Sequence, residues 1–166
     1  MADNGNSAIR RIDAVTGVIT TVAGTGAAGF NGDGISAASA LLNYPSDVFV
    51  DPAGNLWIGD SSNNRVRRVD AVSGIITAVA GTGQQGFSGD GGDALSATLF
   101  FPNGIAVDTA GNLYVADEGN LRLRKVVSLK ATSTTLSVNP NHRTAFNYAH
   151  SGLTKESIRL WAGSDP

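Results

Sequence analysis

Val22-Ala23-Gly24-Thr25-Gly26 returns as Val79-Ala80-Gly81-Thr82-Gly83, 57 residues further along the chain. Around these stretches, residues 14–70 and 71–127 align without a gap and are identical at 31 of 57 positions. A fixed period of this length is typical of repeat architectures, in which each unit buries its apolar faces against copies of itself. The sequence therefore predicts a modular fold whose function lies on the surface that the units build together.

Each 57-residue unit contains four short apolar runs separated by turn residues. In the middle of the chain the runs lie at 48–50, 56–58, 65–69 and 75–79, and the turn sequence Asp-Pro-Ala-Gly-Asn fills 51–55. Their β-branched and aromatic residues predict strands. Because the first two runs are apolar at consecutive positions, we expect cover on both faces. This pattern predicts an all-β fold built from the blades of a β-propeller; a β-solenoid is the alternative.

The composition argues against several kinds of site. The 166 residues are 42% hydrophobic and 16% charged with a net charge of −2, so nothing in the overall charge favours nucleic acid or an anionic membrane. Cysteine is absent from the sequence, and both histidines, His142 and His150, follow the repeats. A zinc site or a histidine-assisted nucleophile in the repeats is therefore not expected. No apolar run approaches the ~20 residues of a membrane span.

Residues 104–126 carry the most specific pattern. They read Gly-Ile-Ala-Val-Asp-Thr-Ala-Gly-Asn-Leu-Tyr-Val-Ala-Asp at 104–117, followed by Asn120 and by Arg-Leu-Arg-Lys-Val at 122–126. Residues 47–67 repeat this pattern with Asp47 in place of the first glycine. The pattern resembles a blade of the NHL-repeat family, and the inserted Gly-rich loops resemble those of its bacterial members. The resemblance implies a propeller of about six blades, of which this chain would supply about two and a half, each four-stranded and antiparallel.

The repeats divide the chain at residue 127. Residues 1–127 are predicted to hold the blades, as units 14–70 and 71–127 and a partial blade at 1–13. Because Met1 falls inside a strand of the pattern, we expect a fragment of a longer propeller; closure by copies of the chain and an open arrangement are the alternatives. The tail 128–166 is unlike the repeat. It resembles the start of a bacterial immunoglobulin-like module, and a disordered end is the alternative.

Two long loops, 24–45 and 81–102, connect successive blades and are expected on one face, where propellers usually bind. The candidate partner-contact residues recur in them: Phe30, Asn31, Asp33, Phe87, Asp90 and Asp93. The phenylalanines either anchor the loops or stand exposed for a partner. The carboxylates either close turns or begin a calcium site, although one loop offers fewer than the 6–8 oxygens that calcium takes. Residues 93–99 are also expected to form one helical turn capped by Asp93.

Charged and aromatic residues recur at fixed strand positions. We expect Asp60 with Arg65, and Asp117 with Arg122, to pair structurally across the second turn of each blade; a repeated ligand contact is the alternative. Eight of the twelve basic residues lie on third strands. Because aspartates flank each cluster, a solvated outer strand is expected rather than a nucleic-acid surface. Trp57 and Tyr114, which share one strand position, are expected to pack between blades.

Together these features predict a non-enzymatic binding or scaffold module, without a cofactor, whose inserted loops contact a protein or a glycan. The alternative is a fragment of a propeller enzyme of the lyase or lactonase type; the resemblance implies, for such enzymes, histidines and carboxylates around a central metal that these repeats do not supply. Predicted partners are that ligand and further propeller blades, in the same chain or in copies of it, with no nucleic acid and no membrane span. Loop type and tail favour an extracellular or cell-surface location.

Overall fold

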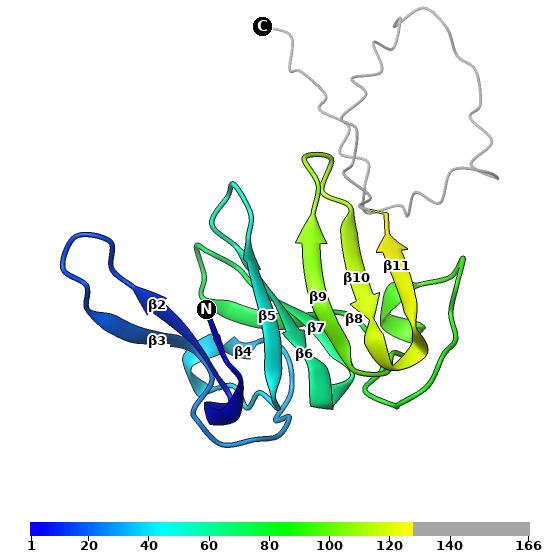
Figure 1. Cartoon of the computed structure of the whole chain (residues 1–166), viewed down its shortest axis with the longest axis horizontal. Helices are drawn as coiled ribbons and strands as arrows, with labels where there is room; N and C mark the ends of the chain where they lie inside the picture. The colour runs from blue at the N-terminus through cyan, green and yellow to red at the C-terminus, as the bar shows by residue number, and fades with distance from the viewer. Residues whose placement is uncertain (128–166) are drawn as a thin grey trace, which may run out of the picture. The chain divides into compact units, whose positions relative to one another are not determined.

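The computed structural model describes residues 1–127, which form three antiparallel β-sheets that follow one another along the chain (Figure 1). Each run predicted in the middle of the chain lies in a strand. The residues of the predicted immunoglobulin-like or disordered tail, 128–166, lie outside the described part. Within the described part, no helix is long and apolar enough to cross a membrane. The prediction of an all-β partial propeller is confirmed.

We name the sheets by their order in the chain. The first sheet contains β1 (Ala2–Asp3), β2 (Ala8–Ile12) and β3 (Ile19–Ala23). The middle sheet contains β4 (Ile35–Ser36), β5 (Pro45–Val50), β6 (Leu56–Asp60), β7 (Arg65–Val69) and β8 (Ile75–Ala80). The third sheet contains β9 (Pro102–Val107), β10 (Leu113–Asp117) and β11 (Arg122–Val126). The 3-10 turns are η1 (Asn4–Asn6), η2 (Ala37–Ser39), η3 (Ser61–Asn63), η4 (Ala94–Ser96) and η5 (Glu118–Asn120).

The middle sheet has a fifth strand that the sequence did not predict. β4, inside the first inserted loop, pairs with the outer strand β8 by aligning Ile35 with Ile76 and Ser36 with Ile75. A strand of two residues is too short to carry an alternating pattern, and the free edge of β8 supplies its partner. The loop therefore leaves the first sheet, runs along the outer edge of the middle sheet, and returns to the inner strand β5.

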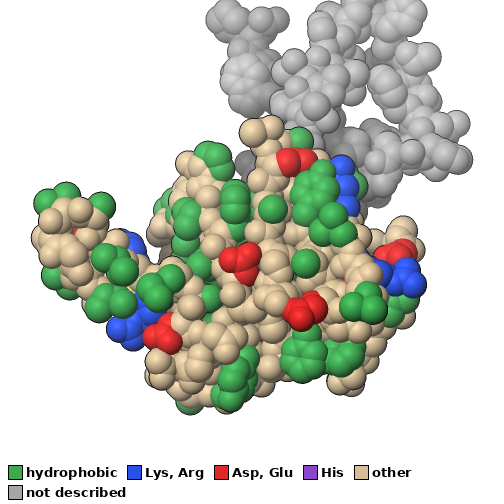
Figure 2. Space-filling model, viewed as in Figure 1, with side chains coloured by type: hydrophobic (Ala, Val, Ile, Leu, Met, Phe, Trp, Pro, Cys, Tyr) green, Lys and Arg blue, Asp and Glu red, His purple; other side chains and the backbone are tan. Residues whose placement is uncertain are grey.

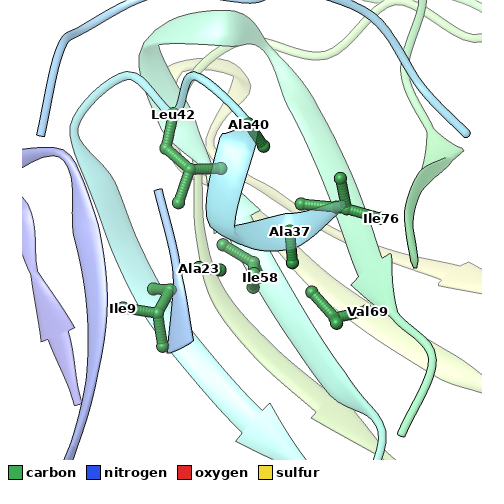
Figure 3. Close-up of a cluster of buried hydrophobic side chains, with 8 residues drawn as sticks. All are labelled: Ile9, Ala23, Ala37, Ala40, Leu42, Ile58, Val69 and Ile76. Carbon is green, nitrogen blue, oxygen red and sulfur yellow. The ribbon is translucent and has the colours of Figure 1, made fainter. Parts of the chain in front are cut away.

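Both faces of the middle sheet are covered by apolar side chains, as the consecutive apolar runs predicted. Val48 and Leu56 pack against an aliphatic cluster shared with the first sheet (Figure 3). Phe49 and Trp57, which point to the opposite face, pack against a second cluster that includes Ile105 and Leu113 and others of the third sheet. The expected packing of Trp57 between blades is confirmed.

The hairpin that carries these two aromatic residues is held by the turn at 51–55. The Asp51 carboxylate accepts hydrogen bonds from the backbone N–H groups of Ala53 (3.0 Å) and Asn55 (2.9 Å). It also accepts from the Asn55 amide (2.8 Å) and from Trp57 Nε1 (3.0 Å). Partial burial alone would raise the pKa of Asp51, but the bonds from Asn55 and Trp57 outweigh it and lower that pKa. The turn therefore orients the Trp57 ring as well as closing the hairpin.

The recurring Val-Ala-Gly-Thr-Gly stretch marks a place where two backbones meet. A Cβ on Gly81 would lie 2.3 Å from the carbonyl oxygen of Asn64, and one on Gly24 would lie 2.4 Å from that of Ser7. Both glycines also have positive φ, +93° and +92°, a region that side chains other than glycine rarely adopt. Glycine is thus required where each outer strand passes into its inserted loop.

Candidate functional site

The inserted loop 24–44 lies over the end of the middle sheet at which β5 begins and β6 ends. Asp60, the last residue of β6, is fully buried there. Its carboxylate accepts hydrogen bonds from the backbone N–H of Asn43 (2.7 Å) and from the Asn63 amide (2.9 Å). Asn63 also donates to the carbonyl of Gly29 (2.7 Å). Burial raises the pKa of Asp60 to about 6, against the opposing effect of these bonds and of Arg67.

Arg67 of β7 lies beneath the same loop and is fully buried. Its Nη1 is 3.6 Å from Asp60 Oδ2 and donates to the carbonyl of Leu41 (3.0 Å). Its Nη2 donates to the carbonyl of Gly32 (2.6 Å) and to Asp33 Oδ1 (3.2 Å). The predicted partner of Asp60, Arg65, is therefore wrong, and so is the predicted solvation of this strand at Arg67. The loop, whose path the sequence did not reveal, folds over β7 and encloses Arg67.

Phe30 fastens the loop from the outside. Its ring centroid lies 4.0 Å from the Arg65 guanidinium carbon and 4.9 Å from that of Arg67. Arg65 in turn donates to the carbonyl of Thr82 (2.6 Å) at the start of the next loop. The phenylalanine is 37% exposed. Of the two roles considered for it, these contacts describe an anchor, held by cation–π attraction.

The third sheet repeats this arrangement 57 residues later. Asp117 accepts from the backbone N–H of Phe100 (2.7 Å) and from the Asn120 amide (2.8 Å). Arg124, rather than the predicted Arg122, lies 3.5 Å from Asp117 and donates to Asp90 (2.7 Å). The Phe87 ring lies 3.9 Å from the Arg122 guanidinium carbon. Both loops are thus held by one device of Asp, Asn, Arg and Phe.

The structure gives every predicted contact residue a partner inside the chain. Asn31 donates to the carbonyl of Ser39 (2.9 Å) and accepts from the N–H of Leu41 (2.8 Å). Asp33 and Asp90 bind the arginines described above, and Phe30 and Phe87 cover them. Asp93 accepts from the N–H of Leu95 (3.3 Å) and caps η4, which confirms the predicted helical turn. Across residues 1–127, no group of three or more His, Cys, Asp or Glu side chains could hold a metal. Calcium stays a prediction.

A hollow of about 580 Å³ opens at this same end of the sheets, and sequence reasoning missed it. It draws its walls from all three sheets and their turns, and its lining includes Asn4, Tyr44, Ser46, Phe101, Asn103 and Glu118. We call it the loop-end hollow. The available signal was an aromatic residue before proline at 44–45 and again at 101–102, where the two inserted loops end.

Tyr44 and Phe101 occupy equivalent positions in the two units and share a strained backbone. Each has a φ of +48°, although neither is glycine. A bulky residue in this region costs on the order of 1–3 kcal/mol and is often found at binding sites. The side chains are nevertheless 52% and 44% exposed, so burial returns little of that cost. The strain therefore holds two aromatic rings at the edge of the hollow.

A fixed polar network lines the wall between the two rings. The Ser46 hydroxyl donates to the carbonyl of Asn103 (2.8 Å) and lies 2.6 Å from the Ser61 hydroxyl. Ser61 donates to the carbonyl of Pro102 (2.5 Å), and the Asn103 amide donates to the Glu118 carboxylate. These bonds join the inner strands of the middle and third sheets. The hollow thus combines aromatic surface with preset hydrogen-bonding groups, as small-ligand sites do.

Two family models match the chain. Residues 72–160, more than half of the chain, match the teneurin NHL domain, and residues 42–69 match the NHL repeat. The first of these matches continues beyond residue 127, into the segment that the 57-residue period sets apart as a tail.

Curated relatives are much longer than this chain. Protein SUPPRESSOR OF QUENCHING 1, chloroplastic, of Arabidopsis thaliana is 33% identical over 134 residues, which cover 76% of this chain and 12% of that protein. Teneurin-1 of Mus musculus is 35% identical over 102 residues, which cover 54% of this chain and 4% of that protein. The chain therefore spans about an eighth or less of these relatives.

Solved structures share the fold. A Bacteroides thetaiotaomicron protein of unknown function superposes with a TM-score of 0.68 at 27% identity, covering 75% of this chain and 31% of its own. An auxiliary nutrient binding protein of Bacteroides ovatus has a TM-score of 0.55 at 23% identity, with coverages of 74% and 32%. A candidate phosphatase of Bacteroides thetaiotaomicron reaches 0.55 at 20% identity, with coverages of 75% and 31%. Together with the two family matches, these likenesses lead to one conclusion: the chain belongs to the NHL-repeat family of β-propellers.

Proposed function

We propose that this chain is a non-enzymatic binding module that contacts a protein or glycan ligand through its loop face. The loop face consists of the inserted loops 24–44 and 81–101 and the loop-end hollow between the sheets. The observation that carries the proposal is the pair of strained, half-exposed aromatic rings at Tyr44 and Phe101, at the edge of a hollow with preset polar groups. Strain kept twice at exposed positions favours a role in binding over a role in stability.

The way the loops are held supports the same proposal. Each loop is tied to a buried aspartate and arginine and covered by a phenylalanine, so its conformation is set before a ligand arrives. A preordered surface loses less conformational entropy on binding and so binds more tightly. The Bacteroides ovatus neighbour is called a nutrient binding protein, which agrees with a binding role. An extracellular or cell-surface location remains a prediction from the loop type.

The enzyme alternative draws less support. In the loop-end hollow the Glu118 carboxylate already accepts a hydrogen bond from Asn103. Both histidines of the chain, His142 and His150, lie outside the described residues. The neighbour described as a candidate phosphatase is 20% identical, a likeness that reaches the fold alone.

The sharpest test replaces both rings with glycine. Because φ is positive at these positions, Tyr44→Gly with Phe101→Gly relieves backbone strain while removing both rings, and we expect the fold to survive. The matched control, Val15→Ala with Val72→Ala, changes two exposed apolar residues, also 57 positions apart, in the turns at the opposite end of the sheets.

Wild type and both variants are applied to a glycan array and to an array of extracellular proteins. We expect the wild type to bind at least one ligand, the ring variant to bind it at least tenfold more weakly, and the control to bind it like the wild type. Equal binding by the ring variant, or no ligand for the wild type on either array, would contradict the proposal. Shortening the loops is a poorer test because they supply the carbonyl partners of the buried Arg67.

A further inference from the structure

A second cleft, of about 610 Å³, lies between the first and middle sheets, away from the loop-end hollow. Its lining includes Ile9 and Val22 from the first sheet and Val48, Leu56 and Val69 from the middle sheet. In Figure 1 the β2–β3 hairpin diverges from β5 on this side, and Figure 2 shows hydrophobic side chains along that hairpin. Ile12 is 57% exposed there. An apolar cleft with this much exposed surface is typical of an interaction site.

The chain contains the same cleft a second time, with its contents in place. Adding 57 to each of the five lining positions gives Val66, Val79, Ile105, Leu113 and Val126. All five belong to the apolar cluster between the middle and third sheets, against which Phe49 and Trp57 pack. The corresponding cluster between the first and middle sheets is built from aliphatic residues alone. The same wall thus accepts two aromatic rings in one place and none in the other.

The exposure of the walls differs accordingly. Leu113 is 2% exposed and Ile105 is 8% exposed, whereas their counterparts Leu56 and Val48 are only partly buried. Val50, on the same face as Val48, is 57% exposed. The cleft between the first and middle sheets therefore has apolar area available for two rings.

The strand edge beside the cleft is also open. In the middle sheet, Arg68 and Val69 of β7 pair with Trp57 and Leu56 of β6. Their counterparts in the first sheet are Arg11 and Ile12 of β2, and pairing with β1 stops at Arg10, which exchanges two hydrogen bonds with Met1. Because amides alternate sides along a strand, the N–H of Ile12 points to the same side as that of Arg10. Within the described residues that side of Ile12 has no partner strand.

We propose that this cleft and the open edge of β2 form a docking site for a β-hairpin of another polypeptide that presents two aromatic side chains. The hairpin adds an antiparallel strand to β2 and places its rings where Phe49 and Trp57 lie in the equivalent interface. Residues 45–58 define the pattern it must have. Arg11 would face the second ring, as Arg68 faces Trp57 with its guanidinium carbon 5.8 Å from the ring centroid. Strand addition with side-chain pockets is an established mode of peptide recognition. This inference does not depend on the proposed function.

The probe is a synthetic peptide with the sequence of residues 44–58, which keeps the Asp51 turn, and the control peptide carries Phe49→Ala and Trp57→Ala. Titration calorimetry with the full chain measures both. We expect the aromatic peptide to bind at least tenfold more tightly than the control peptide, and the exchange of the Ile12 amide hydrogen to slow at least tenfold when it binds. Equal binding of both peptides, or an unprotected Ile12 amide, would overturn the proposal.

Two chain variants locate the binding. Val50→Glu places a charge at the edge of the cleft at an exposed position, so circular dichroism should show a retained fold and calorimetry a loss of peptide binding of at least tenfold. Val72→Glu, at a residue that is 98% exposed and outside the cleft lining, should bind like the wild type. A dimer in light scattering that Val50→Glu dissociates would name a second copy as the occupant and overturn the proposal. Unchanged binding by Val50→Glu would do the same.

Discussion

The two interfaces of this molecule use the same repeated positions, but only the one between the middle and third sheets contains aromatic rings. There, Phe49 and Trp57 lie against a wall that includes Ile105 and Leu113, and these aliphatic residues are almost fully buried. Between the first and middle sheets the equivalent wall residues, Val48 and Leu56, meet aliphatic side chains and remain partly exposed. The aliphatic wall is thus common to both interfaces, and the aromatic hairpin decides how completely it is buried.

The difference shows how a repeat can hold two interfaces of unequal strength. Aromatic side chains each bury 150–250 Å² and dominate the energetics of interfaces. Removing water from apolar area contributes about 25 cal/mol per Å². We therefore expect substitutions at the aromatic interface to cost more free energy of unfolding than matched substitutions at the aliphatic one.

The largest effect is expected for Trp57→Ala, which removes the ring between the middle and third sheets and its bond to Asp51. We expect a loss of about 4 kcal/mol in the free energy of unfolding, as for other large aromatic truncations. Urea denaturation followed by circular dichroism measures it. At the other interface, Val50→Ala should cost less than about 1 kcal/mol, because Val50 is 57% exposed. Similar costs for the two variants would remove the distinction between the interfaces.

The second effect concerns Asp60, in the sheet that both interfaces share. Its pKa is raised by burial from 3.8 to about 6. Because the folded chain holds the proton more tightly than the unfolded chain, the contribution of Asp60 to stability falls as the pH rises through this interval. The full change from pH 4 to pH 7 is at most about 3 kcal/mol, or 1.36 kcal/mol for each pKa unit.

Asp60→Asn isolates this contribution because asparagine does not titrate. We expect the free energy of unfolding of the wild type to fall relative to that of Asp60→Asn as the pH rises from 4 to 7. Denaturation of both proteins at several pH values measures the difference. A difference that stays constant over this range would show that Asp60 titrates at an ordinary pKa, and that the loop does not desolvate it.

A matched pair of leucines gives the next effect. Leu113 and Leu56 occupy the same position in the two units, with Leu113 2% exposed and Leu56 only partly buried. We expect Leu113→Ala to cost about 3 kcal/mol and Leu56→Ala about 1.5 kcal/mol in unfolding free energy. If the docking proposal is correct, saturation with the hairpin peptide raises the cost of Leu56→Ala toward that of Leu113→Ala. An unchanged cost at saturation would count against it.

The sequence predicted the sheets because the repeat states its strands and turns twice. Consecutive apolar runs at Val48–Val50 predicted cover on both faces, and the two apolar clusters confirm it. Trp57 was correctly placed between blades for the same reason. Period and polarity are local signals, and they suffice for strands that pair with their neighbours in sequence.

The path of the inserted loops could not be predicted from such local signals. Arg67 follows Asp60 by seven residues, and nothing local indicates that residues 32–41 fold over it. Arg65, which faces Asp60 in the β6–β7 register, was therefore the nearer choice. The strained aromatic at Tyr44 was missed because its importance lies in φ, which composition does not reveal. Contacts made across about 30 residues of irregular backbone need the three-dimensional structure.

The smallest effect tests a single hydrogen bond across the aromatic interface. Asp47 Oδ2 accepts from the N–H of Ile105 (2.9 Å), a residue only 8% exposed, while Oδ1 accepts from the N–H of Val48 (2.8 Å). Asp47→Ala leaves the Ile105 amide without its acceptor, and we expect a loss of about 1.5 kcal/mol in unfolding free energy. Asp47→Asn, which retains one oxygen, should lose about half as much. Hydrogen exchange at Ile105 provides the local measurement, since its amide should exchange faster in the alanine variant than in the asparagine variant. Equal exchange rates and equal stabilities in the two variants would show that the interface is held by the rings of Phe49 and Trp57 without help from Asp47.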